Sequence, residues 1–561
     1  MTTSEALAVG LARHGVKLTF SQCFPVRTQH VAPKYGIRQI GFRTENAGGA
    51  MADGYARVAR RIAVLAAQSG PAATLLVPPL CEAFKASVPI LALIEESSSI
   101  EADRNAFQEL DHIALFAGCS KWTRRVTHPV RFDDYLDMAI VQATSGRPGP
   151  VVLLLPADFM GLMTQPSPAR SLQLGECPLD RPVPPRERIR AAARALAAAG
   201  RPLIVAGGGV HASGAAAELV RLAELGAIPV ATTNMGKGAI DERSPLSLGV
   251  FGNCMGTGSA AQQLRGFAAD ADLVLLAGTR TNANGTANWT LYPPQARYIH
   301  IDIDGLEIGR NYEAMRLQGD VRATLAALLE ELHPHDFPQR AARRERIAAA
   351  TVAARAHSAA FIEATGPGRE GAVRPEHLMR VLDGILQPDD VFCADASYAT
   401  NWASTFLHAR ADGARFLTPR GMAGLGWGLP LAMGAKLARP EARVFALVGD
   451  GGFGHCWSEL EAARRLNIKV VTIVLNNQIL AYQRHGEEWF LRQHSDAADL
   501  GPVDHAAIAR ACDCFGERVA RPDEFAAVLA RAMQDPRPAL IDVLTDPEAR
   551  PPLSQYLHRP G

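Results

Sequence analysis

This sequence predicts an α/β fold of three doubly wound parallel-sheet domains, and three observations support the prediction. With 561 residues, the chain is long enough for three or four domains. Apolar, β-branched runs alternate with amphipathic helices, which is typical of parallel sheets that helices cover on both faces. Two proline-rich breaks, at 165–185 and 333–371, leave segments of roughly 150 to 190 residues, each the size of one such domain.

The domains are expected at residues 1–165, 185–335 and 372–548. The second break begins with HisProHisAspPhePro at 333–338 and continues through a charged, Ala-rich helix to GlyProGlyArgGluGly at 366–371. Each segment carries its own strands and glycine turns, so each can build a separate sheet.

The composition excludes several classes of partner and location. The 58 basic and 57 acidic residues give a net charge near +1, so no charge block indicates nucleic acid or an anionic membrane. Nine scattered cysteines, an odd number, argue against a disulfide framework and favour a reducing, cytoplasmic location. The first residues predict a helix and not a signal peptide. No apolar stretch has the length that a bilayer requires, so no membrane contact is expected.

Two strands in the last third end in polar residues that could share one metal ion. ValPheAlaLeuVal (444–448) leads into Gly449, Asp450 and Gly451, and a second apolar run ends at Asn476 and Asn477. Oxygen ligands of this kind suit Mg²⁺ that also binds a diphosphate. Gly451 and Gly452 would leave no side chain between a diphosphate and the amides that open the following helix. The alternative is a strand–turn–helix that carries these residues without a ligand.

These residues resemble the signature of thiamine diphosphate (ThDP) enzymes. The resemblance extends over nearly the whole chain to the acetolactate synthase-like family, which includes pyruvate oxidase, benzaldehyde lyase and the acyl-CoA lyases. It implies a pyrimidine-binding first domain, a central domain and a diphosphate-binding third domain. It also implies Mg²⁺ ligands at Asp450, Asn477 and the main-chain carbonyl of Ile479, with Gly449, Gly451 and Gly452 beside the diphosphate.

The segment 44–57 predicts a helix that begins at Glu45 and is rich in small residues, so that it can pack closely against a partner. A glutamate at this position could simply complement the helix dipole. The resemblance instead implies that Glu45 is catalytic: its carboxyl group would hydrogen-bond the pyrimidine ring of ThDP and drive it into the imino form that activates the coenzyme. The family commonly has histidine before this glutamate, whereas this chain has Thr44.

Two further stretches of the first third are expected to line the pocket. PheGlnGluLeuAsp (107–111) resembles a family segment whose glutamine lies beside the reacting centre, so Gln108 is a candidate for orienting the substrate. A solvated loop amide is the alternative. CysPheProVal (23–26) follows the first strand and is closer to the oxalyl-CoA decarboxylase branch than to the glycine-rich turn of acetolactate synthases.

The last third also carries residues that the resemblance places against the coenzyme. In the glycine-dense turn 419–430, Leu425 would wedge between the two rings, and the carbonyl of Ala423 would accept a hydrogen bond from the pyrimidine. The alternative is a helix N-terminal turn with one core leucine. Ser397 and Tyr398 follow another strand and are expected to touch the diphosphate or the substrate. The segment 481–489 is expected to overhang the reacting carbon.

The middle third predicts a nucleotide site of undecided use. A strand at 202–206 enters the turn Gly207–Gly209, a weak dinucleotide-like pattern. By resemblance, Arg280 would meet phosphate, and Asp302 or Asp304 would meet ribose. The stretch 248–256 lacks the histidine that contacts flavin in acetolactate synthases. FAD, ADP and an empty site remain open, with FAD the preferred interpretation.

The sequence therefore predicts a ThDP- and Mg²⁺-dependent enzyme that cleaves or forms C–C bonds of 2-keto acids, an acetolactate synthase-like carboligase or decarboxylase. The alternative is a 2-hydroxyacyl-CoA lyase or oxalyl-CoA decarboxylase-type enzyme with an acyl-CoA substrate. A nicotinamide oxidoreductase would leave Glu45, Asp450 and Asn477 without a role, and the intact Glu45 argues against an inactive homologue. The resemblance implies a homodimer or homotetramer with active sites at the subunit interface.

Overall fold

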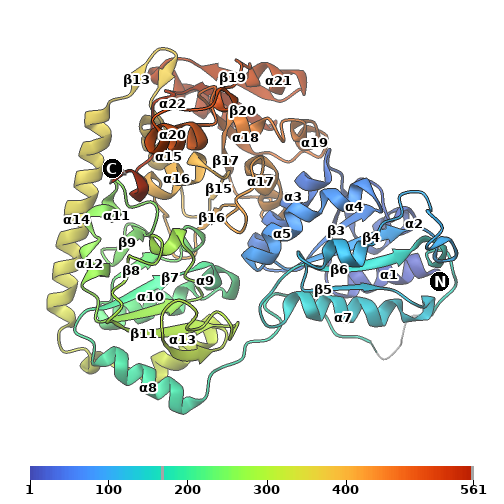
Figure 1. Ribbon diagram of the computed structural model, residues 1–561, viewed down its shortest axis with the longest axis horizontal. Helices are drawn as coiled ribbons and strands as arrows, with labels where there is room; N and C mark the ends of the chain where they lie inside the picture. Colours follow the sequence, from blue (N-terminus) through green and yellow to red (C-terminus); the bar gives the residue numbers. More distant parts are fainter. Residues whose placement is uncertain (166–169, 558–561) are drawn as a thin grey trace. The chain divides into compact units, whose positions relative to one another are not determined.

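The computed structural model of the protein describes residues 1–165 and 170–557. The described chain forms two compact units (Figure 1). Unit 1 contains Met1–Asp180, Pro419–Glu441 and Cys456–Val470. Unit 2 contains Arg181–Thr418, Ala442–His455 and the chain from Val471 onward. Two pieces of the last third thus belong to the unit that the N-terminal residues form.

Unit 1 contains one six-stranded parallel sheet in the order β2-β1-β3-β4-β6-β5. The strands are β1 Leu18–Ser21, β2 Arg38–Ile40, β3 Ala63–Gln68, β4 Ile90–Glu96, β5 Trp122–Arg125 and β6 Val151–Pro156. Helices α1 (Thr3–Arg13) and α7 (Phe132–Thr144) cover one face, where Leu7 and Leu136 join the buried side chains of the strands. Helices α3 (Glu45–Ala59) and α5 (Val77–Ala86) lie on the other side of the sheet (Figure 1).

Helix α3 packs closely against α17 (Gly428–Ala438), and glycines on both helices make this possible. A Cβ atom on Gly54 would lie 2.1 Å from the carbonyl oxygen of Leu431. A Cβ atom on Gly434 would lie 1.9 Å from the carbonyl oxygen of Met51. Any larger residue at either position would therefore push the helices apart, which confirms the prediction that the small residues of this helix serve close packing.

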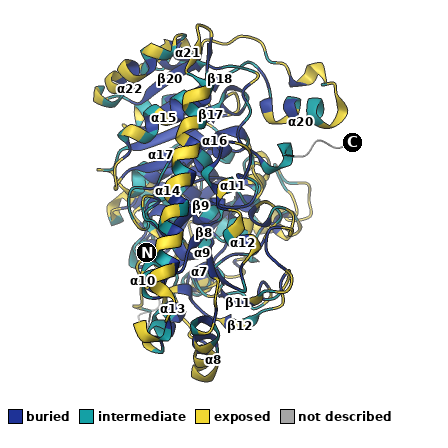
Figure 2. Cartoon of the chain, turned by 90° about the vertical axis from the view of Figure 1, so that its left-hand side faces the viewer, coloured by how far each residue is buried: buried dark blue, intermediate teal, exposed yellow. Residues whose placement is uncertain are grey.

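Unit 2 contains two six-stranded parallel sheets. The middle sheet has the order β12-β11-β10-β7-β8-β9, with β7 Pro202–Ala206, β8 Val230–Thr232, β9 Ser247–Val250, β10 Leu273–Ala277, β11 Arg297–Asp302 and β12 Met315–Gln318. Its helices include α8 Arg186–Ala197, α9 Gly208–Ser213, α10 Ala216–Gly226 and α13 Val321–Glu330. The predicted charged helix is α14 (Arg340–Thr365), which is largely exposed (yellow in Figure 2) while the strands are buried.

The third sheet has the order β16-β15-β17-β18-β20-β19. Its strands are β15 Val391–Ala394, β16 Arg415–Leu417, β17 Val444–Gly449, β18 Val471–Asn476, β19 Phe515–Val519 and β20 Ala539–Leu544. Its helices in unit 2 include α15 Pro375–Ile385, α16 Tyr398–Phe406, α18 Asp450–Phe453, α20 Ala481–Leu491, α21 His505–Ala511 and α22 Phe525–Gln534. A short helix, α19 (Glu459–Arg465), lies in unit 1.

Three parallel sheets in an α/β arrangement confirm the predicted fold class. Each sheet has a point where the strand order reverses: between β1 and β3, between β7 and β10, and between β15 and β17. In open parallel sheets, ligands bind at this switch point, outside the carboxyl ends of the strands. The topology therefore predicts that ligands bind beside the residues that follow these six strands.

Among the described residues, no helix combines the length and apolar character that crossing a bilayer would require.

Candidate active site

At the switch point of the third sheet, Asp450 follows β17 as the first residue of α18. Its side chain is buried, with a relative exposure of 8%. One carboxylate oxygen accepts the main-chain N–H of Gly451 at 2.9 Å, and the other accepts that of Gln478 at 2.6 Å. Burial raises the pKa of Asp450 to about 6, although these hydrogen bonds act in the opposite direction. A nearby cation would favour the ionised form, so this carboxylate suits a metal ligand.

The hydrogen bond to Gln478 joins the two predicted halves of the metal site. Asn477 and Ile479 flank Gln478 directly after β18, and the side-chain oxygen of Asn477 accepts the N–H of Ile479 at 3.3 Å. Gln478 takes the left-handed conformation, with φ of 59°, which turns the chain back toward Asp450. The structure therefore brings Asp450 and the segment 477–479 together, as the sequence predicts.

The glycines of this turn differ in what surrounds them. A Cβ atom added to Gly449 would meet nothing within 4 Å, so the chain leaves open space there. A Cβ atom added to Gly451 would lie 2.6 Å from the side-chain end of Leu480. The turn thus places oxygen atoms that can ligate a metal beside a space that a diphosphate could occupy. This arrangement fits Mg²⁺ and ThDP.

On the other side of the switch point, Ser397 and Tyr398 follow β15. Ser397 has φ of 66°, in the left-handed region that a side chain rarely adopts, and it immediately precedes α16. Tyr398 is buried, and its hydroxyl group contacts His485 and Tyr556. Strain of this kind is often found near functional sites, and here it sets the direction in which α16 leaves the sheet.

In unit 1, Glu45 is the first residue of α3, as predicted, and its side chain is partly exposed. Thr44 caps the helix, because its hydroxyl oxygen accepts the N–H of Ala47 at 3.3 Å. The residue that replaces the common histidine of the family thus has a structural role here. The helix dipole favours a carboxylate at this position.

Gln108 lies in a loop of unit 1 with φ of 61°. Its amide oxygen is buried and has no hydrogen-bond partner among the described residues. The side chain lies against Gly70, where an added Cβ atom would come within 2.7 Å of the Cβ of Gln108. His112 supports this contact, since one ring nitrogen faces the N–H of Gly70 at 3.4 Å and the other lies 2.9 Å from a carboxylate oxygen of Glu96.

Ala423 and Leu425 lie in the turn that precedes α17, also in unit 1. Ala423 has φ of 62°, and the Leu425 side chain is 37% exposed. Leu425 is thus not fully buried in the core of unit 1. The carboxylate of Glu82 holds this turn by accepting the N–H groups of Gly421 at 2.6 Å and of Ala423 at 3.3 Å.

Glu82 belongs to a buried charged group that the sequence analysis missed. Its carboxylate lies 3.5 Å from the guanidinium of Arg57, which also pairs with Asp53 at 2.6 Å. Burial raises the pKa of Asp53 to about 6. The signal for Glu82 is one acidic residue within the apolar segment ValProProLeuCysGluAlaPhe (77–84), where a glutamate is costly without a partner.

A second missed residue, Glu459, lies beside the start of α3. Its buried carboxylate accepts the N–H groups of Arg43 at 3.0 Å and Thr44 at 3.1 Å. Burial raises the pKa of Glu459 to about 7. Unit 1 therefore fixes the residues on either side of Glu45 through a cap from Thr44 and an anchor from Glu459.

The predicted nucleotide residues of the middle sheet gather at one edge. Gly207 follows β7, Arg280 follows β10 and Asp302 ends β11, three adjacent parallel strands. A Cβ atom on Gly209 would lie 2.7 Å from the Cα of Gly278, and one on Gly207 would lie 2.3 Å from the carbonyl oxygen of Gly278. These glycines are therefore required by the close contact between two turns, whether or not a nucleotide binds.

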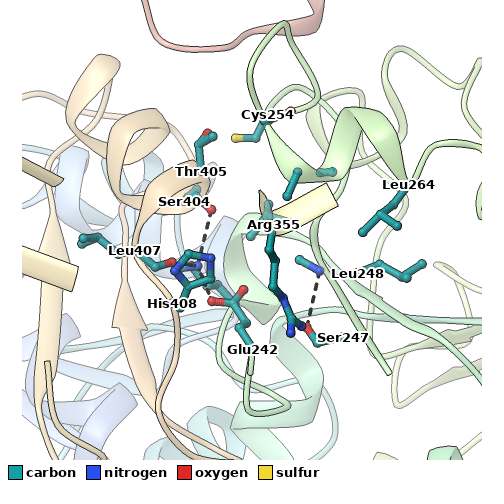
Figure 3. Close-up of a pocket in the computed structure, with 16 residues that line it drawn as sticks. Glu242, Ser247, Leu248, Cys254, Leu264, Arg355, Ser404, Thr405, Leu407 and His408 are labelled. Atoms are coloured by element: carbon teal, nitrogen blue, oxygen red, sulfur yellow. Dashed lines mark hydrogen bonds and ion pairs between the residues drawn. The ribbon is translucent and has the colours of Figure 1, made fainter. Parts of the chain in front are cut away.

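The stretch 248–256 lines a small cavity of about 30 Å³ in unit 2, which has room for about one water molecule (Figure 3). Cys254 and Thr405 lie at one end, and Glu242 and Arg355 lie near the other. One oxygen of Glu242 pairs with the ammonium group of Lys237 at 2.6 Å. The cavity is too small for a flavin ring.

Comparison with known proteins defines the class. Residues 1–115 match the family described as the thiamine pyrophosphate enzyme N-terminal TPP binding domain. Residues 189–328 match the central domain of these enzymes, and residues 395–543 match their C-terminal TPP binding domain. Thiamine pyrophosphate is another name for ThDP. The fold and these matches together describe an enzyme built on ThDP-binding domains.

Whole-chain relatives narrow this class. The chain is 31% identical to a probable acetolactate synthase large subunit of Methanocaldococcus jannaschii, covering 98% of this chain and 93% of that protein. It is 32% identical to an acetolactate synthase of Mycobacterium bovis, over 98% of this chain and 89% of that protein. An acetolactate synthase of Arthrospira platensis is 30% identical, over 97% and 94% of the two chains. The chain belongs to the acetolactate synthase-like family of ThDP-dependent enzymes.

Proposed function

We propose that this enzyme uses ThDP and Mg²⁺ to form or cleave a C–C bond of a 2-keto acid, as a carboligase or decarboxylase. The observation that carries the proposal is the direct link between Asp450 and the segment 477–479 at the switch point of the third sheet. A buried carboxylate beside a side-chain amide oxygen and a main-chain carbonyl is the ligand set that Mg²⁺ accepts together with phosphate oxygens.

Named residues would hold the coenzyme in this proposal. Asp450, Asn477 and the carbonyl of Ile479 would bind Mg²⁺, and the glycine turn Gly449–Gly452 would lie against the diphosphate. Ser397 and Tyr398 would meet the diphosphate or the substrate. The pyrimidine-binding, central and diphosphate-binding domains would occupy residues 1–165, 185–335 and 372–548.

The coenzyme supplies a nucleophilic carbon and an electron sink when it is bound. Leu425, whose side chain is available at the surface of unit 1, would contact its rings, and the carbonyl of Ala423 would accept a hydrogen bond from it. The carboxyl group of Glu45 would share a proton with a ring nitrogen and so fix the reactive tautomer. Gln108 has an amide group with an unused acceptor, which suits a role in orienting the substrate.

We propose in addition that the active unit is a homodimer or homotetramer whose sites combine Glu45 of one subunit with the metal site of another.

In the middle sheet, Arg280 and Asp302 lie at the same edge and would hold the phosphate and ribose of FAD, or of ADP. Release of small molecules from the purified protein, followed by mass spectrometry, identifies which of them it carries.

The test of the proposed function is turnover of pyruvate with ThDP and Mg²⁺, measured for the wild type and for Glu45→Gln. We expect Glu45→Gln to lose at least about 100-fold in kcat while it still binds ThDP, because proton sharing is lost and the site otherwise remains. The control is Glu187→Gln, which changes an exposed first-turn glutamate of α8.

Full activity of Glu45→Gln would contradict this role. Cleavage of a 2-hydroxyacyl-CoA in place of pyruvate would assign the enzyme to the acyl-CoA branch. Absence of ThDP-dependent turnover with either substrate class would overturn the proposed activity.

A further inference from the structure

A chain of hydrogen bonds in unit 2 connects the start of α16, helix α20 and the C-terminal turn. The hydroxyl of Tyr398 lies 3.0 Å from Nδ1 of His485 and 2.7 Å from the hydroxyl of Tyr556. Nε2 of His485 lies 2.8 Å from the carbonyl oxygen of Pro547. These contacts join residues that are far apart in the sequence.

The chemistry of the end groups fixes the direction of this chain. The carbonyl of Pro547 can only accept, so Nε2 of His485 carries the hydrogen. In a neutral imidazole, Nδ1 then accepts the hydrogen bond from Tyr398. The hydroxyl of Tyr398 has donated its own hydrogen, so it accepts from Tyr556. The order of donation is therefore Tyr556, Tyr398, His485 and the carbonyl of Pro547.

Burial keeps the groups in the protonation states that this direction needs. Burial lowers the pKa of His485, and the nearby guanidinium of Arg550 acts the same way, so the imidazole stays neutral near neutral pH. Burial also raises the pKa of Tyr398 and Tyr556, so both hydroxyl groups keep their hydrogens. The rings of Tyr482 and Trp489 pack edge-on against Tyr398 and Tyr556, respectively.

The charged residues around the imidazole are largely paired with one another. Glu488 and Glu548 lie close enough to His485 that the three could surround a metal ion. However, both ring nitrogens of His485 already have partners, and Glu488 pairs with Arg550 at 2.9 Å and with Arg484 at 3.0 Å. This cluster is therefore better described as a packed support than as a metal site.

We propose that Tyr398, His485 and Tyr556 are positioning residues for the substrate side of the active site. Their hydrogen bonds hold α20 and the C-terminal turn (554–556) against the start of α16. Helix α20 begins two residues after Ile479, the proposed metal ligand, and α16 begins at the switch point. Fixing both helices fixes the wall beside the proposed metal site. The inference rests on the proposed function for the identity of the substrate.

The experiment compares Tyr398→Phe, Tyr556→Phe and His485→Asn with the wild-type holoenzyme. We expect each phenylalanine variant to raise the KM for pyruvate about 5- to 10-fold, the size of one lost hydrogen bond, and Tyr556→Phe to change ThDP affinity less than about 2-fold. We expect His485→Asn to lose less, since its amide can still donate and accept. The control is Tyr135→Phe, which removes an exposed hydroxyl contact to Thr127 in unit 1.

Amide hydrogen exchange provides a readout that does not depend on catalysis. We expect exchange of residues 481–491 to accelerate about 5- to 10-fold in both Tyr398→Phe and Tyr556→Phe, because the two changes break the same chain. Unchanged exchange in both variants would overturn the inference, as would equal loss of ThDP affinity and substrate affinity in Tyr556→Phe. Faster exchange in an enzyme that does not turn over pyruvate would instead overturn only the proposed function.

Discussion

The middle and third sheets of unit 2 carry glycine turns at equivalent switch points, but the surroundings of these glycines differ. In the middle sheet, Gly207 and Gly209 are required because the neighbouring turn at Gly278 leaves no room for a Cβ atom. In the third sheet, Gly449 faces open space and Asp450 is a buried carboxylate beside that space. The chain closes the middle turn at both glycines, whereas the third turn is closed by Leu480 at Gly451 but open at Gly449, beside the oxygen ligands.

The difference shows that a glycine-rich strand–turn–helix is not evidence of a phosphate site until the surroundings of the glycines are known. The middle turn would look the same in sequence whether or not a nucleotide binds, since packing alone requires it. The third turn has a feature that packing does not explain, namely open space at Gly449 beside the buried carboxylate of Asp450.

The largest effect is expected for Asp450→Ala. Removal of the only carboxylate among the proposed ligands should lower ThDP- and Mg²⁺-dependent kcat/KM by about 100-fold or more. Calorimetric titration with Mg²⁺ and ThDP, together with steady-state kinetics, measures the change. Asp389→Ala, at an exposed position before β15, is the control. Equal metal and coenzyme affinity in Asp450→Ala and the wild type would remove the metal site from this turn.

Gly449→Ala tests whether the open space belongs to a ligand. Alanine can adopt its φ of −83°, and the added methyl group would meet no atom of the described residues within 4 Å, so the melting temperature should not change. ThDP affinity should fall about 50-fold, because the methyl group would take the place of the diphosphate. Unchanged ThDP affinity would show that the diphosphate does not occupy the open space at Gly449.

Gly209→Ala should have the opposite effects: a lower melting temperature and an unchanged ThDP affinity. The added methyl group would meet the backbone of Gly278, so we expect a loss of about 2 kcal/mol in stability of unit 2, seen as a lower melting temperature. ThDP affinity of the remaining folded protein should stay close to that of the wild type. An unchanged melting temperature would mean that the middle turn is not closed by packing.

The smallest effect concerns Glu459, which is a buried acid like Asp450. Asp450 lies beside open space, whereas main-chain N–H groups already surround Glu459. Glu459 has its pKa raised to about 7, but the N–H groups of Arg43 and Thr44 already bind it. Because the folded pKa lies above the ordinary value of 4.5, its contribution to stability is full below pH 4.5 and is lost as the pH rises through about 7. Glu459→Gln should therefore reduce the fall in the free energy of unfolding between pH 5 and pH 8 by on the order of 1 kcal/mol, seen as a smaller fall in melting temperature.

The control for this pH dependence is Glu101→Gln, at an exposed position of unit 1. It should leave the difference in melting temperature between the two pH values as it is in the wild type. If Glu459→Gln and Glu101→Gln behave alike, the buried carboxylate of Glu459 does not titrate in this window.

Much of the fold followed from the sequence, since alternating apolar strands and amphipathic helices predict parallel sheets. The start of α3 at Glu45 and the position of Asp450 after β17 were also predicted, because local strand and cap signals determine them. The pairing of Asp450 with the segment 477–479 followed from the rule that parallel strands end at one edge.

The remaining site features depend on contacts that no local signal encodes. Glu82 binds the amides near Ala423 across 341 positions of sequence, and Tyr398 meets Tyr556 across 158. The association of 419–441 and 456–470 with unit 1 is likewise a tertiary property. In the middle sheet the glycines alone do not indicate whether a nucleotide binds, because close packing and phosphate binding select the same residue.

In the proposed function, the turn at Asp450 binds Mg²⁺ together with ThDP. The most direct test is anomalous diffraction from crystals of the wild type grown with ThDP and Mn²⁺ in place of Mg²⁺. We expect one strong peak in contact with the carboxylate of Asp450, the side-chain oxygen of Asn477 and the carbonyl of Ile479, at about 2.0 to 2.3 Å from each. Bound ThDP with no peak at these three atoms, or with its metal at another site, would contradict it.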